Sequence, residues 1–361
     1  RASSAIALVA KTLSTSGSTT VDQLFLSSLR VDLLKLIGRF GRQIMDQPSI
    51  LYEILPAFCP RLSSIHQQFH RSSSQILVRD PKGEDWSDIL GRLCTAENVH
   101  VWDVQCAVGV VAALASSGTV YMWDPRNLME LGRIPHASPV ISMAISENGC
   151  RLATYSSKTT RLWSLPDGTL LASVPSPTHS RILSMTFSSH HDGILAGCTD
   201  NAVRFWASGC LQNGWGVLLQ DVPRAASHAT SCGTPTHVQF NSRAETVATS
   251  CRDAPLSVWR LSDGKLVKQL LKLDLGYGRQ PYGDWFQVRD FTWNAPTGHI
   301  IGVHITGEVF KWHPISDEAL SSQRVAHEVA VSPGGRVFAT YRSSGVIQIW
   351  NFSAFSVVHE L

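Results

Sequence analysis

The 361-residue sequence is short of charge, and this shortage excludes several classes of protein. Asp, Glu, Lys and Arg make up only 16% of the chain, whereas they make up about 25% of an ordinary globular domain. A disordered chain needs high net charge and little apolar content, and a coiled coil needs charged positions beside its apolar seam. Neither is expected here, because 43% of the residues are hydrophobic. The net charge of +3 is also too small to indicate a nucleic-acid partner.

Long hydrophobic runs are absent as well. No stretch approaches the roughly 18 apolar residues of a membrane-spanning helix, and the mean hydropathy is +0.01. The run Ala5–Ala10 is brief and Lys11 ends it, so we read it as a helix turn rather than a signal peptide. We therefore expect no membrane association and a cytoplasmic location. The chain begins at Arg1 rather than Met, and we interpret it as a fragment of a longer protein.

The motifs of catalytic and metal sites are missing too. None of the eight cysteines forms a C-x-x-C pair, and their scatter favours free thiols. There is no Gly-x-x-x-x-Gly-Lys-Ser/Thr phosphate loop and no Gly-x-Ser-x-Gly nucleophile turn. His327-Glu328 lacks the second His of a zinc helix, and His190-His191-Asp192 fits a solvated hairpin turn. We therefore predict no catalytic residue, no metal site and no cofactor.

The sequence divides into two parts by the spacing of its apolar residues. Residues 1–93 are predicted to form an α-helical segment and linker. The box Thr20–Gln23 caps a helix whose apolar residues recur at helical spacing until Pro48, and two shorter apolar segments, 50–58 and 62–69, follow. Residues 72–84 are polar and resemble a linker. From residue 94 to 361, short apolar runs alternate with Ser, Gly, Asn and Asp clusters, which predicts many short strands.

Within residues 94–361 a tryptophan recurs at nearly regular steps. Six copies of strand, polar turn and strand each end at a Trp, with steps of 40, 43, 53, 53 and 38 residues between Trp123, Trp163, Trp206, Trp259, Trp312 and Trp350. Propeller blades of this kind span about 40–45 residues. An upstream strand also recurs, as at 140–145 and 329–331, and would be the inner strand of its blade. The sequence therefore predicts an all-β propeller with six visible blades.

These repeats resemble those of WD-repeat proteins. Trp123-Asp124 supplies the Trp-Asp dipeptide at a strand end. In that family a His, a Ser or Thr, a turn Asp and the Trp form a hydrogen-bonded set inside a blade. The positions that match its members are His136, Thr249, Thr340, Asp200 and Asp253, although no copy has all four.

The number of blades is left open by the repeats. A seventh blade could be missing beyond Leu361 or incomplete, the six could close alone, or the ring could stay open with exposed strands. We predict the first of these.

The helical segment resembles part of another family. Residues Pro48–Phe69 and the acidic-Trp element Asp85–Leu93 resemble a stretch of fungal NACHT–WD-repeat proteins, which are STAND-type signalling NTPases similar in plan to NOD-like receptors. The resemblance implies that an NTPase domain lies upstream, and that this chain is the C-terminal sensor region. A generic helical cap is the alternative reading of the same residues.

The function that we expect is protein interaction or ligand sensing without catalysis. Residues 1–93 hold 11 Lys and Arg against 8 Asp and Glu, and residues 94–361 hold 20 of each, so the propeller is a poor candidate for binding nucleic acid. Protein partners are expected, and a small-molecule ligand is a second class that the resemblance allows. The alternative is a propeller hydrolase with its site in the central channel, which would need three or more acidic or His side chains at the channel mouth.

Two long intervals between tryptophans point to a partner-binding patch. Their extra residues fall at Arg224–Pro235 and Asp274–Trp285, which we expect to connect neighbouring blades. Long loops on rigid scaffolds often carry binding sites. The second connection holds aromatic residues and an arginine, the types that anchor interfaces: Tyr277, Arg279, Tyr282 and Trp285. The alternative is that these aromatics only pack the loop onto the next blade.

Overall fold

The computed structural model is an all-β propeller of six four-stranded blades preceded by a short helical segment. It forms two compact units, Arg1–Ile134 with the helices and blade 1, and Pro135–Leu361 with blades 2–6. The structure describes residues 20–50, 54–69, 95, 99–125, 130–136, 138–165, 167–177, 180–189, 192–207, 214–220, 234–241, 245–252, 254–277, 285–316 and 318–361.

The helical segment contains the long helix α2 (Thr20–Asp46) and two short helices, α4 (Leu55–Phe58) and α5 (Ser64–Phe69). The first helix begins at the predicted cap Thr20 and ends before Pro48. A small core of Leu36, Leu55, Cys59 and Ile65 holds the three helices together. The side chains of the predicted capping box lie outside the described residues, and so does the element 85–93. The domain boundary at 93/94 remains a prediction.

Each blade is an antiparallel sheet whose four strands follow one another in sequence order. From the inner to the outer strand the blades are: blade 1, β1 (Val101–Ala107), β2 (Val110–Ala115), β3 (Val120–Trp123) and β4 (Glu130–Ile134); blade 2, β5 (Val140–Ile145), β6 (Arg151–Ser156), β7 (Thr159–Ser164) and β8 (Thr169–Pro175); blade 3, β9 (Ile182–Phe187), β10 (Gly193–Cys198), β11 (Val203–Ala207) and β12 (Gly216–Leu219); blade 4, β13 (Pro235–Asn241), β14 (Thr246–Cys251), β15 (Ala254–Arg260) and β16 (Leu266–Gln269); blade 5, β17 (Val288–Asn294), β18 (His299–His304), β19 (Glu308–Trp312) and β20 (Ala319–Val325); blade 6, β21 (Glu328–Val331), β22 (Val337–Tyr341), β23 (Ile347–Asn351) and β24 (Ser356–Glu360).

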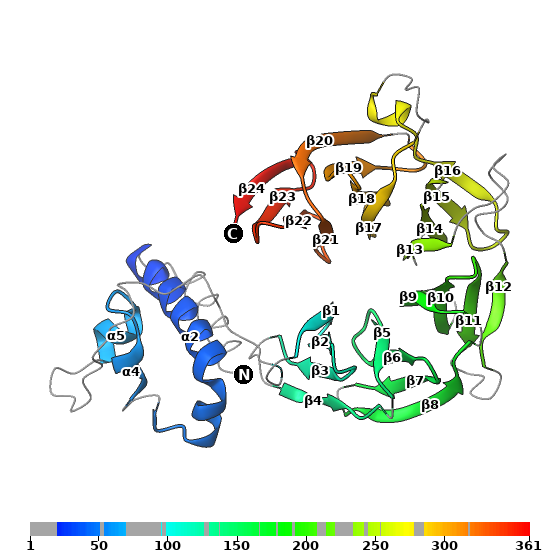
Figure 1. The fold of residues 1–361 in the computed structure, drawn as a ribbon. Coiled ribbons are helices and arrows are strands. Elements are labelled where there is room, and N and C mark those ends of the chain that lie inside the picture. Colours follow the sequence, from blue (N-terminus) through cyan, green and yellow to red (C-terminus); the bar gives the residue numbers. More distant parts are fainter. Residues whose placement is uncertain are drawn as a thin grey trace. The chain divides into compact units, whose positions relative to one another are not determined.

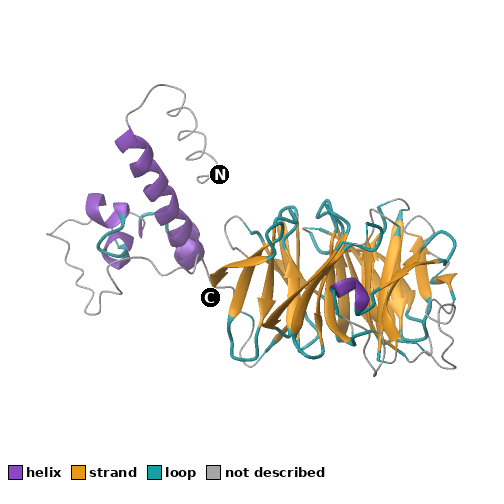
Figure 2. Ribbon diagram, turned by 90° about the horizontal axis from the view of Figure 1, so that it is seen from above, coloured by secondary structure: helices purple, strands orange, loops and turns teal. Residues whose placement is uncertain are grey.

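All six repeat tryptophans lie on the third strand of a blade, as the spacing predicts. Within blades 2–6 the inner strands contact their neighbours in order, and they face a common centre in Figure 1. Figure 2 views the strands from the side, with turns at both of their ends. The seventh blade that the sequence predicts is not among the described strands and stays a prediction.

The core of the second unit lies between successive blades. Blades 3–6 each present their tryptophan to the apolar face of the blade before: Trp259 packs with Leu195 and Val203 of blade 3, and Trp350 packs with Val303 and Val309 of blade 5. The indoles of Trp206, Trp259 and Trp312 are 0% exposed. Burying a side chain of this size contributes a large share of the stability of each interface.

Three of the six repeat tryptophans donate an indole hydrogen bond to a threonine on the second strand of the same blade. The distances from indole nitrogen to threonine Oγ1 are 2.8 Å for Trp163–Thr154, 3.1 Å for Trp259–Thr249 and 2.9 Å for Trp350–Thr340. The predicted roles of Thr249 and Thr340 are thus confirmed, and Thr154 joins them.

Blades 3 and 5 lack this bond because the matching positions are Ala196 and Gly302, two residues beyond the strand partners of Trp206 and Trp312. The Nε1 atoms of these two tryptophans are buried without an acceptor among the described residues. A side chain could not be added at Gly302, since its Cβ would lie 2.3 Å from the Phe310 ring.

The other members of the WD set are only partly in place. The ring of His136 lies 6.3 Å from that of Trp163, in the blade where the sequence places it. Asp200 instead forms an ion pair with Arg204, with one N–O distance of 2.8 Å, and this hydrogen bond lowers the pKa of Asp200 to about 2. Asp253 lies outside the described residues.

Thr249→Val tests the indole bond, because valine keeps the shape of threonine but offers no acceptor. We expect a loss of about 1–3 kcal/mol in the free energy of unfolding, the cost of a buried donor left without a partner. Urea unfolding followed by tryptophan fluorescence measures it. The exposed Thr169→Val is the matched control and should change little.

The reverse change gives Trp206 the acceptor that it lacks. Ala196→Ser adds one oxygen at the position that Thr249 fills in blade 4, and we expect a gain of about 1 kcal/mol. If Thr249→Val is neutral while Ala196→Ser destabilises the chain, the indole bond is not what stabilises these blades.

Candidate functional site

The strand order assigns every turn of blades 2–6 to one of two faces. Because neighbouring strands are antiparallel, the turns after the first and third strands lie on one face. The turns after the second strands and the connections between blades lie on the other. We call these the turn face and the connection face.

Both long intervals that the sequence singled out are connections between blades. The first joins β12 to β13 and the second joins β16 to β17, so they lie on the connection face on either side of blade 4. Of the four candidate residues, Tyr277 and Trp285 are described and half-buried, whereas Arg279 and Tyr282 lie outside the described residues. Most of the first connection also lies outside them, so the proposed patch stays a prediction.

The described part of the second connection is anchored on blade 5. It contains the short helix η3 (Leu273–Leu275), which packs against β20. The rings of Tyr277 and Phe286 meet edge to face at 5.0 Å, and the ammonium of Lys272 lies 4.8 Å from the Phe286 ring. Burial raises the pKa of Tyr277, as expected for a phenol that leaves water. These contacts fix both ends of the connection.

Beneath Phe286 lies a buried histidine. His304 is 1% exposed, and its ring lies 4.6 Å from those of both Phe286 and Phe310. Neither ring nitrogen has a hydrogen-bond partner among the described residues. Burial lowers the pKa of His304 to about 4, because a charged imidazolium loses its hydration between two phenyl rings. The connection therefore rests on a histidine that must stay neutral.

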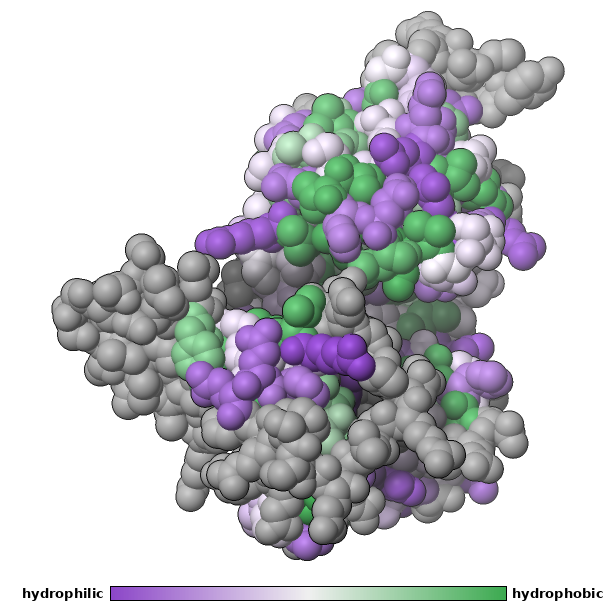
Figure 3. Space-filling view, turned by 90° about the vertical axis from the view of Figure 1, so that its left-hand side faces the viewer, coloured by the Kyte–Doolittle hydropathy of each residue, from purple (hydrophilic) through white to green (hydrophobic). Residues whose placement is uncertain are grey.

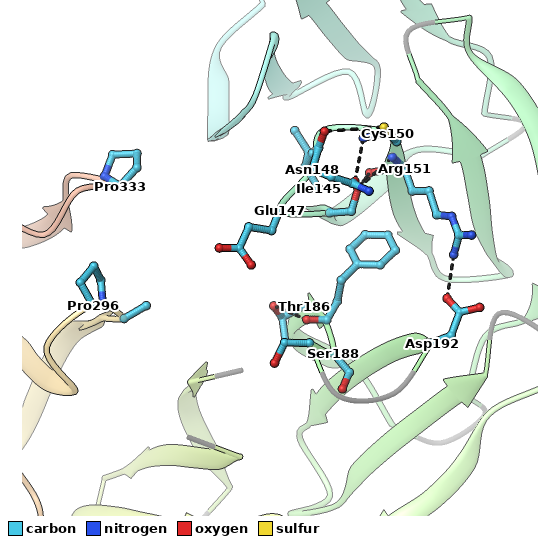
Figure 4. A pocket seen from close by; sticks show the side chains of 15 residues that line it. Ile145, Glu147, Asn148, Cys150, Arg151, Thr186, Ser188, Asp192, Pro296 and Pro333 are labelled. Atoms are coloured by element: carbon cyan, nitrogen blue, oxygen red, sulfur yellow. Dashed lines mark hydrogen bonds and ion pairs between the residues drawn. The ribbon is translucent and has the colours of Figure 1, made fainter. Parts of the chain in front are cut away.

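The turn face holds a pocket of about 660 Å³. It is lined by the turns after the first strands of blades 2, 3, 5 and 6, and Figure 4 shows side chains from these turns around it. The sequence does not predict this pocket, since it arises only where turns from distant repeats converge. The one signal for it was the recurring Ser-x-x-Gly turn, at Ser146–Gly149 and Ser332–Gly335.

Hydrogen bonds inside these turns make the pocket rim rigid. In blade 2 the hydroxyl of Ser146 accepts from the backbone N–H of Arg151 at 2.9 Å, and the N–H of Gly149 donates to the carbonyl of Ser146 at 2.8 Å. Gly149 has a φ of 70°, which favours glycine. In blade 6 the same bond joins Gly335 to Ser332 at 2.8 Å. Each of these two turns is therefore closed by a hydrogen bond of its own backbone.

The charges at the pocket are few and partly paired. Arg151 and Asp192 form an ion pair at 2.8 Å that links the turns of blades 2 and 3. In Figure 4 the carboxylate of Glu147 points away from this pair, toward Pro296 and Pro333 on the opposite side. Among the described residues no group of three or more His, Cys, Asp or Glu side chains could hold a metal ion.

Comparison with known families identifies two stretches. Residues 130–164 and 168–207 match the family model of the WD domain, G-beta repeat. Each match runs from the outer strand of one blade to the third strand of the next, β4–β7 and β8–β11, so the sequence repeat is offset from the structural blade by one strand. No curated protein matches the chain. WD40 propellers are typically scaffolds for protein interaction.

Within the part of the chain that the structure describes, no helix is both long enough and apolar enough to cross a membrane.

His304→Phe is predicted to remove an acid-sensitive step in stability. The folded-state pKa of His304 is about 4, below its ordinary value of 6.5. Its contribution is therefore fully present above pH 6.5 and is lost as the pH falls from 6.5 to 4, by up to about 3 kcal/mol. Urea midpoints at pH 7.5 and pH 5 measure this. His359→Phe on the exposed strand β24 is the control and should keep the slope; equal slopes for wild type and His304→Phe would contradict the assignment.

Proposed function

We propose that the chain is a non-catalytic propeller that binds protein partners, and that it forms the sensor region of a STAND-type signalling receptor. The observation that carries the first part is the use of the inner-strand polar groups. Asp290 of β17 accepts from the backbone N–H of Val329 at 2.9 Å, and Asn294 donates to the carbonyl of Gly335 at 2.9 Å. Both side chains tie blade 5 to blade 6.

This use of polar groups speaks against the hydrolase alternative. A hydrolase needs carboxyl groups gathered around a substrate. Burial raises the pKa of Asp290, but its carboxylate is engaged with the neighbouring blade, and Asp192 is engaged with Arg151. Of the two carboxylates that line the pocket, Glu147 points away from Asp192, so the pair is not gathered around one point. Rigid blades that hold variable turns and connections support binding instead.

The receptor part of the proposal rests on the helical segment. The stretch with the family resemblance forms α4 and α5, whose residues Leu55, Cys59 and Ile65 pack on Leu36 of α2. The backbone N–H of His66 donates to Ser63 Oγ at 3.1 Å, which caps α5 where the resemblance has a serine. Such a segment would connect an upstream NTPase to the propeller, and we place the receptor in the cytoplasm. A protein partner is favoured over a small molecule because the second connection carries aromatic residues and an arginine, the types that anchor protein interfaces.

Partner capture tests the binding patch. Tyr277→Ala, Arg279→Ala and Tyr282→Ala together should lower capture of a cross-linked partner at least about tenfold, since aromatic and arginine anchors dominate interfaces. Tyr277→Phe with the other two substitutions keeps the contact with Phe286, and it separates lost binding from lost folding. Glu147→Ala on the opposite face is the control. Capture that the triple variant leaves unchanged means that the patch is wrong.

Translation of the natural gene tests the receptor assignment. We expect its product to contain a Gly-x-x-x-x-Gly-Lys-Ser/Thr loop before residue 1 and to bind ATP, because that loop cradles phosphates. Labelling with an ATP photoprobe, with and without Lys→Ala in the loop, measures this. A product without such a loop contradicts the receptor assignment and leaves the binding proposal standing.

A further inference from the structure

The pocket on the turn face has no part in the proposed function. Its volume of about 660 Å³ lies in the range of ligand sites, which is about 300–1,000 Å³. All of its lining residues belong to the second unit, between Ile145 and Pro333. The described surface in Figure 3, by contrast, mixes hydrophobic and hydrophilic residues and favours no single class of ligand. The pocket combines charge and apolar surface in a defined arrangement.

Two linked pairs of turns form opposite sides of the pocket. The ion pair between Arg151 and Asp192, at 2.8 Å, joins the turns of blades 2 and 3. The side chain of Asn294, which is 0% exposed, donates to the carbonyl of Gly335 at 2.9 Å and joins the turns of blades 5 and 6. Figure 4 shows the turns of blades 2 and 3 across the pocket from those of blades 5 and 6. Each side therefore has a cross-link of its own that resists deformation by a ligand.

The lining residues carry a net negative charge. The two carboxylates of Glu147 and Asp192 stand against the one guanidinium of Arg151, which gives −1. Asp192 lies against Arg151, whereas the carboxylate of Glu147 points across the pocket toward Pro296 and Pro333. A positive charge in the pocket would therefore be attracted to Glu147.

Hydrogen bonds hold the turn that carries Glu147. The hydroxyl of Ser146 donates to Oδ1 of Asn148 at 2.7 Å, and the backbone N–H of Cys150 donates to the same oxygen at 3.0 Å. The residues on both sides of Glu147 are thus held in place, while its own side chain is exposed. The carboxylate therefore projects from a fixed position on the rim.

Apolar side chains line the pocket as well. Ile145 and Phe187 are half-buried at the ends of neighbouring inner strands, and Pro296 and Pro333 are exposed on the opposite side. Long cationic side chains suit this mixture, because they bury their methylene stems on apolar surface and keep the charged head for a carboxylate. An acidic ligand would instead bring a second negative charge close to Glu147. The lining thus selects lysine or arginine.

We propose that this pocket binds a lysine or arginine side chain on an extended segment of a partner protein. The charged head lies at Glu147, and the stem lies against the rings of Pro296 and Pro333. A protein segment is favoured over a free amine because one side chain fills only part of the pocket. The hydroxyl groups of Thr186 and Ser188 also line it, and they can donate to and accept from a peptide backbone.

Peptide titration tests the proposal. Fluorescein-labelled pentapeptides that differ only in a central Arg, Lys, Glu or Ala are titrated with residues 1–361, and the fluorescence anisotropy gives each Kd. We expect the Arg and Lys peptides to bind at least about tenfold more tightly than the Glu peptide, because an attraction of opposite charges replaces a repulsion of like charges. The Ala peptide should lie between them.

Two substitutions of Glu147 assign this preference to its carboxylate. Glu147→Gln should remove the difference between the Arg and Glu peptides, and Glu147→Lys should reverse it. Because Glu147 is exposed, neither change should disturb the fold. Asp263→Asn is the matched control, since Asp263 is an exposed carboxylate in the turn after β15, on the same face but outside the pocket. It changes the net charge as much as Glu147→Gln does and should keep the preference.

Other results overturn the proposal. A preference for cations that Glu147→Gln leaves unchanged, or that Asp263→Asn reduces equally, shows attraction to the whole face rather than to the pocket. Equal binding of the four peptides, or no binding at about 1 mM protein, shows that the pocket does not select a cationic segment. Propylguanidine is the arginine side chain alone. If it displaces the Arg peptide at equal concentration, the site takes small cations rather than a protein segment.

The pocket and the patch of the second connection can be tested separately. The variant with Tyr277→Phe, Arg279→Ala and Tyr282→Ala should bind the Arg peptide as tightly as the unaltered chain, because that patch is on the connection face. A loss of peptide binding in this variant would place the peptide on the connection face and overturn the pocket site. Failure of the patch alone leaves the pocket proposal standing.

Discussion

The contact on which the rest of the second unit depends is the packing of the tryptophan faces of blades 3–6, each on the blade before it. A four-stranded sheet alone cannot bury both of its faces, so each blade gains its stability from its neighbours. The close approach that this needs is visible at Gly197, where a Cβ would lie 2.3 Å from Val238 of the next blade. The buried indole N–H then needs a hydrogen-bond acceptor, because a buried donor without one costs free energy. Thr154, Thr249 and Thr340 meet that requirement in three blades, whereas blades 3 and 5 leave it unmet.

This division explains how much of the fold could be predicted from the sequence. The tryptophan spacing predicts the third strand of all six blades, because packing between blades requires a large buried side chain at that position. The threonine was harder to find, since it is one polar residue among many, and Thr154 was passed over although its blade keeps the bond. The family match reaches blades 2 and 3 but not blades 4 and 6, which keep the indole bond. The shared geometry therefore extends further than the shared sequence.

The candidate sites were less predictable for a physical reason. Connection length can be read from a sequence, so both long connections were found and both lie between blades. What they contact cannot be read in the same way. Tyr277 meets Phe286, and Phe286 meets His304, only after β17 and β18 have folded. The pocket on the turn face is even harder to predict from the sequence, because turns from four blades converge there and no single repeat contains it.

The turn face and the connection face of the second unit differ in the contacts that hold their loops. On the turn face, bonds such as Arg151 N–H to Ser146 close single turns, and the Arg151–Asp192 ion pair and the Asn294–Gly335 hydrogen bond join turns of neighbouring blades. On the connection face, the described ends of the segment after β16 are held by ring contacts from Tyr277 through Phe286 to His304, beside the core that contains Trp312. Movement of that segment should therefore disturb the packing of blade 5. Protonation of His304 should in turn loosen the contact between Phe286 and blade 5. We therefore expect a partner that binds the connection face to act on the packing of blade 5.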